Sequence, residues 1–330
     1  MLTSAIVIAM LVTACASTSA DTPADASSTP TTAPPTTQQL AASAITPDVI
    51  TISSADVPLP EPQTASPTAG APHRIVSLAT GVGETLAALG VADRVVGRDE
   101  TSNVPQIADA PVVTKAHAAS AERVLATNPD LVIIDAATSP PEVITQLRDA
   151  GVTVVEVPEA WTLDDIAPRT HAVADAVGVP TAVADAVIAE ATAAASPSSA
   201  ATGTRPRVAF LYLRGTSAIY LVGGRGSGAD ALIAAAGGTD AGADAGHAAF
   251  VPLTAESVAM LNPDVILVMT KGLESVGGID GLVALPGVAQ TKAGRDRRVI
   301  AVDDTLLLSF GPRTGRLVDQ LATAIGRLAP

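Results

Sequence analysis

Apolar runs and polar turns alternate along the chain from about residue 72 to its last residues. Arg74–Ala79 reads as a short strand, and the helical pattern of Gly83–Gly90 follows it. Arg207–Tyr212 and Gly228–Gly237 repeat this order, with an inserted turn and strand between them. The pattern therefore predicts two units in which strands and helices alternate, which is typical of mostly parallel α/β sheets.

A repeat without gaps links residues 120–134 with residues 254–268. Each segment begins with Ser or Thr before Ala-Glu, reaches Asn-Pro-Asp, and continues into an uninterrupted apolar run. The hydroxyl residue suits a helix N-cap, the proline ends the helix, and the apolar run suits a strand buried on both faces. The repeat indicates an internal duplication with two Rossmann-like α/β lobes, at about 72–160 and 199–330.

Residues 161–198, between the lobes, are rich in Ala and Val, and Gly178–Pro180 is their clear break. This pattern predicts one helix to about residue 177 and a long helix from about residue 181. Because a helix is stiff, this inter-lobe connection is expected to allow little hinge motion. Paired α/β lobes bind ligands at the carboxyl ends of their strands, so the cleft between the lobes is the expected site.

The first part of the chain has a different composition. Residues 1–15 form an apolar run with small residues before Cys15, the only cysteine, although no Lys or Arg precedes the run. The run is too short to span a bilayer and resembles a bacterial lipoprotein signal, which would make Cys15 the lipidated residue. Residues 16–71 consist mostly of Thr, Ser, Ala and Pro, which predicts a disordered tether.

Composition narrows the classes of partner. The formal net charge is −14 and the chain has no basic stretch, which argues against a nucleic acid partner. Aromatic residues make up 2% of the chain, and only two of them are tyrosines. A tyrosine at a strand end therefore stands out as a candidate functional residue.

Tyr212 and Arg214 are the strongest candidates for binding chemistry. Phe210, Tyr212 and Arg214 alternate along one strand, so they share a face. Phenolate is a hard ligand that suits ferric iron, and tyrosine is a known axial ligand of haem. Arg214 would favour the ionised phenol and could also bind a carboxylate. The alternative is a tyrosine that caps the core with its hydroxyl in water.

His117 lies in a loop just before a helix of the first lobe, so it is expected to face the cleft from the side opposite Tyr212. One imidazole and one phenolate would hold a flat Fe(III) porphyrin from both sides, whereas zinc or manganese needs three or four converging ligands. The alternative for a lone loop histidine is an exposed side chain. His247, with Phe250 nearby, lies in the corresponding loop of the second lobe and could line the same cleft.

Other charged residues have candidate roles. Arg214 is the nearest candidate to neutralise a propionate group, and Arg225 and Lys115 are weaker candidates. Glu122 and Glu256 occupy the same position in the two copies of the repeat. A carboxylate there either complements the helix dipole or, as one of two symmetry-related carboxylates, docks a two-fold partner. Gly223–Gly228 lacks the Gly-Lys-Ser/Thr ending of a phosphate-binding loop and indicates a flexible glycine turn.

With these motifs in place, residues 73–330 resemble the substrate-binding proteins of bacterial ABC importers that have two α/β lobes and a rigid helix between them. Members of this family carry ferric siderophores, cobalamin or haem. Within it, the chain is most similar to the haem-binding HmuT-type lipoproteins of actinobacteria. Those proteins have a lipoprotein signal, a polar tether, a first-lobe histidine before the Ala-Glu helix, and Tyr-x-Arg in the second lobe.

The resemblance implies specific roles for residues already singled out. His117 and Tyr212 would be the axial ligands of the haem iron, Arg214 would hydrogen-bond to the tyrosine, and Met269 would lie at the pocket wall. Glu122 and Glu256 would pair with arginines on the two subunits of the permease.

The expected function is a lipid-anchored, extracytoplasmic receptor that binds haem b as a transported ligand. It would deliver haem to a two-fold ABC permease with its ATPase, as a monomer and not as an enzyme, with upstream cell-surface haem proteins as candidate donors. One alternative is a siderophore or cobalamin receptor of the same fold, although the few aromatic residues argue against it. A remoter alternative is a chelatase-like enzyme, which the lipoprotein signal argues against.

Overall fold

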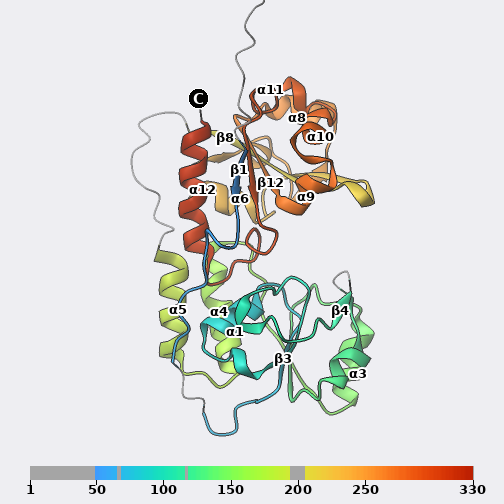
Figure 1. Cartoon of the computed structure of the whole chain (residues 1–330), viewed down its shortest axis with the longest axis vertical. Helices are drawn as coiled ribbons and strands as arrows, with labels where there is room; N and C mark the ends of the chain where they lie inside the picture. Colours follow the sequence, from blue (N-terminus) through green and yellow to red (C-terminus); the bar gives the residue numbers. More distant parts are fainter. Residues whose placement is uncertain (1–48, 65–67, 116–117, 194–204, 330) are drawn as a thin grey trace, which may run out of the picture. The chain divides into compact units, whose positions relative to one another are not determined.

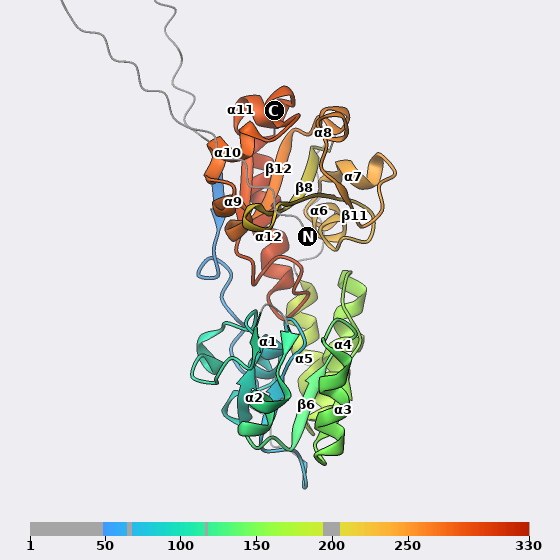
Figure 2. The ribbon, with the colours of Figure 1, turned by 90° about the vertical axis from the view of Figure 1, so that its right-hand side faces the viewer.

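The computed structural model describes residues 49–64, 68–115, 118–193 and 205–329, all within one compact unit, Ala44–Pro330 (Figure 1). Two α/β lobes make up this unit, an N lobe drawn below and a C lobe drawn above, and the same separation is visible after a quarter turn (Figure 2). The predicted fold class of two α/β lobes with a helical connection is confirmed.

The N lobe is built on a four-stranded parallel sheet with the order β3-β2-β6-β7. Side chains of β6 are buried on both faces, as the apolar run predicts. Helices α1, α4 (Ile166–Ala176) and α5 (Thr181–Ala193) pack on one face of the sheet, and α2 and α3 pack on the other. The elements are β2 (Ile75–Ser77), α1 (Val82–Ala88), β3 (Val95–Arg98), α2 (Ala121–Ala126), β6 (Leu131–Ile134), α3 (Pro141–Asp149) and β7 (Thr153–Glu156).

The C lobe is built on a seven-stranded mixed sheet with the order β1-β13-β12-β8-β9-β11, and β10 pairs with β8. The strands are β1 (Val49–Ile52), β8 (Arg207–Arg214), β9 (Ile219–Gly223), β10 (Thr239–Asp240), β11 (Phe250–Pro252), β12 (Val265–Met269) and β13 (Val299–Val302). The helices are α6 (Ala229–Ala235), α7 (Ala241–Asp244), α8 (Ala255–Leu261), α9 (Thr270–Ser275), α10 (Gly278–Ala284), α11 (Lys292–Asp296) and α12 (Thr314–Leu328).

Strand β8 divides the C-lobe core into two layers. Val208 and Phe210 pack against α6 and α12, whereas Ala209, Leu211 and Leu213 pack against α8, α10 and α11. Tyr212 continues the first set, because side chains alternate between the faces of a strand. The position of Tyr212 on the α6 and α12 face is therefore set by the same alternation that buries Phe210.

The repeated sequence motif has the same structural role in both lobes. Its aspartate accepts a hydrogen bond from a backbone N–H group just before β2 in the N lobe and at the start of β8 in the C lobe, so it fixes where that strand begins. Asp130 accepts from Arg74 at 3.0 Å, and Asp264 accepts from Arg207 at 3.0 Å. The preceding asparagine, Asn128 or Asn262, has a left-handed backbone that ends the helix.

The predicted tether was wrong for residues 49–64. Strand β1 pairs in parallel with β13 at the edge of the C-lobe sheet. The segment after β1 buries Val57 completely, and Ile52 at the end of β1 is 2% exposed. A short apolar pattern inside a polar segment was enough to add a strand to an existing sheet. Cys15, residues 1–15 and the rest of the predicted tether up to residue 48 lie outside the described residues.

The helical connection consists of α4 (Ile166–Ala176) and α5 (Thr181–Ala193), with a break at the predicted position. Both helices contribute side chains to the N-lobe core, and α5 also contacts α12 of the C lobe. Residues 194–204, which complete the connection, lie outside the described residues. Helices in the described part of the chain are all too short or too polar to cross a membrane.

A buried ion pair joins the two lobes. Arg313, immediately before α12, donates from Nε to Glu84 Oε2 at 3.0 Å, and its Nη2 contacts Glu84 Oε1. Glu84 belongs to α1 and is 1% exposed, and Arg313 is 3% exposed. Burial raises the pKa of Glu84, and the hydrogen bonds and charge of Arg313 oppose that shift. Arg313 also donates to the Val57 carbonyl, so three separate segments meet at one guanidinium.

Arg313→Ala is expected to lower the free energy of unfolding by about 3–5 kcal/mol, because Glu84 would remain buried without its partner. Arg316→Ala is the matched control, since Arg316 lies three residues further on, in the first turn of α12, but pairs with Glu190 at a side-chain exposure of 38%. A loss of at most about 1 kcal/mol is expected for the control. Chemical denaturation of both variants measures the difference, and equal losses would contradict the role of the buried pair.

Candidate functional site

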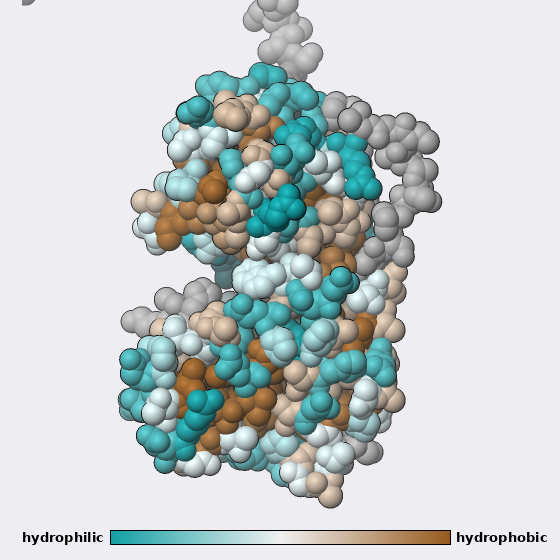
Figure 3. Space-filling model, turned by 180° about the vertical axis from the view of Figure 1, so that it is seen from behind, coloured by the Kyte–Doolittle hydropathy of each residue, from teal (hydrophilic) through white to brown (hydrophobic). Residues whose placement is uncertain are grey.

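A cavity of about 750 Å³ opens between the two lobes, where the surface is hollowed (Figure 3). Its volume is within the range of pockets that bind small organic ligands. The wall is formed by segments that follow the carboxyl ends of the parallel strands, as expected for α/β lobes. The lining residues include Thr80, Gly81, Glu100, Asp135, Glu159, Trp161 and Arg169 of the N-lobe side, and Tyr212, Arg214, Met269, Lys271, Asp304, Leu307, Leu308 and Ser309 of the C lobe.

Tyr212 and Arg214 both line this cavity. The guanidinium carbon of Arg214 lies 4.6 Å from the centroid of the Tyr212 ring, which is a cation–π contact. Arg214 is also held by an ion pair with Asp304 at 3.4 Å and a hydrogen bond to the Leu213 carbonyl at 2.9 Å. The expected hydrogen bond from Arg214 to the tyrosine hydroxyl is absent among the described residues, because the guanidinium stacks on the ring.

Phe250 and Met269 support this pair from two sides. The Phe250 ring packs edge-on against Tyr212, with centroids 5.7 Å apart and an interplanar angle of 66°. Phe250 therefore holds the tyrosine ring and is not among the residues that line the cavity. Met269, at the end of β12, does line the cavity, and its sulfur lies 3.6 Å from Arg214 Nη2. The Tyr212 ring is fixed on both of its sides.

His247 and Arg225 lie away from the cavity wall, contrary to their expected role in lining it. The backbone N–H of Arg225 donates to the His247 carbonyl at 3.0 Å, so the two loops pair with each other. Gly224 is pressed against the same segment, where an added Cβ would lie 2.5 Å from the Ala248 carbonyl oxygen. This close backbone pairing explains why the glycine turn does not contribute side chains to the cavity.

Two further predicted residues cannot be placed at the cavity. His117 lies outside the described residues, and so does the side chain of Lys115. The second axial ligand therefore stays a prediction. Glu122 and Glu256 are exposed in the first turns of α2 and α8, in equivalent positions of the two lobes.

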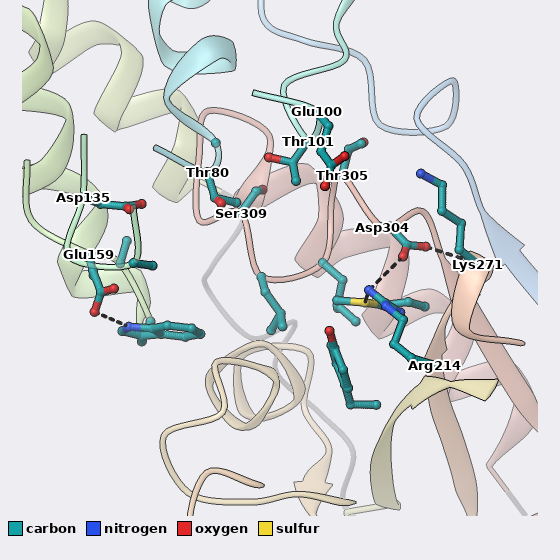
Figure 4. Close-up of a pocket in the computed structure, with 18 of the residues that line it drawn as sticks. Thr80, Glu100, Thr101, Asp135, Glu159, Arg214, Lys271, Asp304, Thr305 and Ser309 are labelled. Atoms are coloured by element: carbon teal, nitrogen blue, oxygen red, sulfur yellow. Dashed lines mark hydrogen bonds and ion pairs between the residues drawn. The ribbon is translucent and has the colours of Figure 1, made fainter. Parts of the chain in front are cut away.

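Several cavity residues were missed by the sequence interpretation, most notably Trp161, Lys271 and Arg169. Trp161 follows β7, is 40% exposed, and donates from its indole nitrogen to Glu159 at 3.2 Å (Figure 4). Lys271 follows β12 in the same way. Inspection of the segment after each parallel strand, rather than after β8 alone, would have identified both of them.

Arg169 is a buried cation of the N-lobe wall. It is 6% exposed, donates to the Thr80 carbonyl, and lies 3.9 Å from the Asp135 carboxylate. Burial lowers the pKa of Arg169, and the negative charges of Asp135, Glu159 and Asp99 oppose that shift. Its positive charge is therefore already balanced by carboxylates of its own lobe.

The loop after β13 closes the cavity floor. Leu308 and Phe310 have left-handed backbones, with φ of 71° and 44°, which bulky side chains rarely adopt. The loop packs tightly on the N lobe, since a Cβ at Gly81 would lie 2.7 Å from the Ser309 carbonyl oxygen. Such strain persists only where the surrounding structure determines the conformation, which here is the packed junction of the two lobes.

Among the described residues, no three His, Cys, Asp or Glu side chains are arranged to hold a bare metal ion. In a porphyrin complex, by contrast, four ring nitrogens already ligate the iron. One or two protein ligands then complete the coordination. The tyrosine at the cavity wall suits this second case.

Comparison with known proteins identifies the family. The sequence profile of the periplasmic binding protein family matches residues 75–306, and the chain belongs to that family. The expected resemblance to two-lobed substrate-binding proteins is therefore confirmed.

Three known proteins are similar to this chain in sequence or structure. The structure resembles the apo form of the periplasmic heme-binding protein RhuT from Roseiflexus sp. RS-1, with 44% identity, a TM-score of 0.74, and coverage of 78% of this chain and 99% of that one. An uncharacterized ABC transporter substrate-binding lipoprotein of Bacillus subtilis, YvrC, is 26% identical over 77% of this chain and 80% of its own length. A cobalamin-binding protein of Halobacterium salinarum is 28% identical over 77% of this chain and 69% of its own length.

Trp161 provides a test of where a ligand binds, because it is the only tryptophan of the chain and lines the cavity. Titration with haemin is expected to quench its fluorescence in step with binding, since the porphyrin absorbs where indole emits. The Trp161→Phe variant is the control, which should bind haemin without that signal. Stoichiometric binding that leaves the emission of Trp161 unchanged would place the ligand outside this cavity.

Proposed function

We propose that this protein is an extracytoplasmic receptor that binds haem b in the inter-lobe cavity and delivers it to an ABC importer. The observation that carries the proposal is Tyr212 at the cavity wall, with Arg214 over its ring and Phe250 against its edge. A phenolate held in this way suits ferric haem iron. The similarity to RhuT, a periplasmic heme-binding protein, supports the same ligand.

The cavity has the chemistry that a porphyrin needs. Trp161, Leu307, Leu308 and Met269 supply apolar surface for a flat ring, and Tyr212 supplies the oxygen ligand. In the described part of the chain the Tyr212 hydroxyl forms no hydrogen bond, so its oxygen has no protein partner that competes with an iron. His117, from the N lobe, is proposed as the second axial ligand.

Delivery would use the exposed carboxylates Glu122 and Glu256. They project from equivalent helices of the duplicated lobes, so together they suit a permease with two-fold symmetry. The similarity to YvrC, an ABC transporter substrate-binding lipoprotein, supports this class of partner. Lipidation at Cys15 would anchor the receptor to the outer face of the cell membrane, and the protein would act as a monomeric carrier and not as an enzyme.

Cobalamin is the second candidate ligand, because a cobalamin-binding protein is among the relatives. Haem is favoured for two reasons: the similarity to RhuT is higher, at 44% identity against 28%, and the cavity presents a tyrosine ligand. A competition titration separates the candidates. Haemin should stay bound in an excess of cyanocobalamin or of a ferric siderophore, and displacement by either one would reverse the assignment.

Tyr212→Phe is expected to change the Soret band of the haem complex strongly, because it removes the iron-ligating oxygen and little else. Tyr212→Ala should have at least the same effect. Tyr220→Phe is the matched control, since Tyr220 packs with the core layer on the opposite face of the sheet. Absorption spectra of the purified proteins with haemin measure the difference, and identical spectra for both Phe variants would refute the tyrosine ligand.

His117→Ala is expected to shift the same spectrum more mildly than Tyr212→Phe, if the phenolate dominates the ligation. The comparison uses equal concentrations of protein and haemin. A larger effect of the histidine substitution would assign the dominant role to the imidazole.

Replacement of Glu122 and Glu256 by Lys is expected to abolish haem uptake in cells and to leave haemin affinity within about twofold. The reason is that both side chains are exposed and neither lines the cavity. Asp319→Lys on α12 provides an exposed acidic control. Uptake that continues in the double variant would exclude docking through these carboxylates.

A further inference from the structure

The charged groups of the cavity wall are unevenly placed. Asp135 and Glu159 lie at the N-lobe end, and Arg214, Asp304 and Lys271 lie at the opposite end (Figure 4). Glu100, a further carboxylate of the wall, lies nearer to this second group than to the first. Arg169 does not make the charge of the N-lobe end positive, because the nearby carboxylates already balance its own charge. An anionic group inside the cavity therefore meets excess negative charge at the end of Asp135 and Glu159, and it finds the cations Arg214 and Lys271 only at the opposite end.

Lys271 is the one cation of the described cavity wall that has no ion pair of its own. Arg169 faces Asp135, and Arg214 pairs with Asp304 at 3.4 Å, whereas the Lys271 ammonium has no partner in the described part of the chain. The backbone N–H of Lys271 donates to Asp304 at 2.9 Å, which fixes the start of α9 beside Arg214. An exposed lysine is ordinarily only solvated, but this one is anchored at the rim of the ligand cavity.

The opposite end offers an apolar surface. A Cβ at Gly228 would lie 3.4 Å from the Trp161 ring, 3.1 Å from Leu308 and 3.0 Å from Phe310, so these side chains converge on one place. Trp161 and Leu308 line the cavity there, and the indole nitrogen is already bonded to Glu159. This end therefore has apolar contacts to offer and no free cation among the described residues.

We infer that the bound ligand lies with its carboxylate edge at Lys271 and its apolar edge at Trp161. The inference rests on the proposed function, because haem carries its two carboxylates on one edge of the ring. Lys271 then replaces Arg214 as the carboxylate partner, since the Arg214 guanidinium is occupied by Asp304 and the Tyr212 ring. The placement of Lys271 and Trp161 thus favours one orientation of a planar dicarboxylate in the cavity.

Two probes and three variants test this assignment. The probes are haemin and haemin dimethyl ester, which has the same ring and iron but no carboxylates. The variants are Lys271→Ala, Lys271→Arg, and Arg225→Ala as a control that removes an exposed positive charge away from the cavity. Affinity is measured by titration at two ionic strengths, because a charge interaction at the cavity rim weakens with salt.

Lys271→Ala is expected to weaken haemin binding by about three- to tenfold, as for a partly exposed charge pair, and to leave ester binding unchanged. Lys271→Arg should restore most of the haemin affinity, and Arg225→Ala should bind both probes as the unmodified protein does. The assignment would be overturned if Lys271→Ala and Arg225→Ala changed the affinity for haemin equally. It would also be overturned if Lys271→Ala lowered the affinity for haemin and for its ester by the same factor. If the unmodified protein binds neither probe, the proposed function itself fails.

Discussion

The buried ion pair between Glu84 and Arg313 is the interaction on which the ligand cavity depends. It connects the first helix of the N lobe to the last helix of the C lobe, with both side chains almost completely buried. The loop after β13 leads directly to Arg313 and forms the cavity floor, pressed against Gly81. A motion that parted the two side chains while either of them stayed buried would leave an unpaired buried charge, which is costly, so the ion pair favours a preformed cavity.

The same preorganisation extends to the proposed iron ligand. Tyr212 is placed by the alternation of β8, Phe250 fixes one side of its ring, and Arg214 covers a face. Asp304 in turn holds Arg214, and it also receives the backbone of Lys271. A ligand therefore meets a tyrosine and a positive rim that are already in position, and little side-chain ordering remains to oppose binding.

The duplication made most of the fold predictable, because each copy contains local sequence signals. These are the Ser or Thr that caps the helix, the Asn-Pro-Asp sequence that ends it, and the apolar run of the buried strand. The tyrosine and arginine were also predictable, since strand ends face the cleft. The Glu84–Arg313 pair was not, because its members are 229 residues apart and each resembles an ordinary surface charge in the sequence. Arg225 and His247 were misplaced for a related reason: backbone pairing between their loops has no sequence signature.

The proposed function depends most on ligation of the haem iron by the Tyr212 oxygen in this cavity. Resonance Raman spectroscopy of the haemin complex tests it most directly, because iron-bound tyrosinate has ring vibrations that a free phenol lacks. These vibrations are expected in the unmodified protein and in Tyr220→Phe, and they should be lost in Tyr212→Phe. A haem complex without tyrosinate vibrations, or one in which they survive Tyr212→Phe, would contradict it.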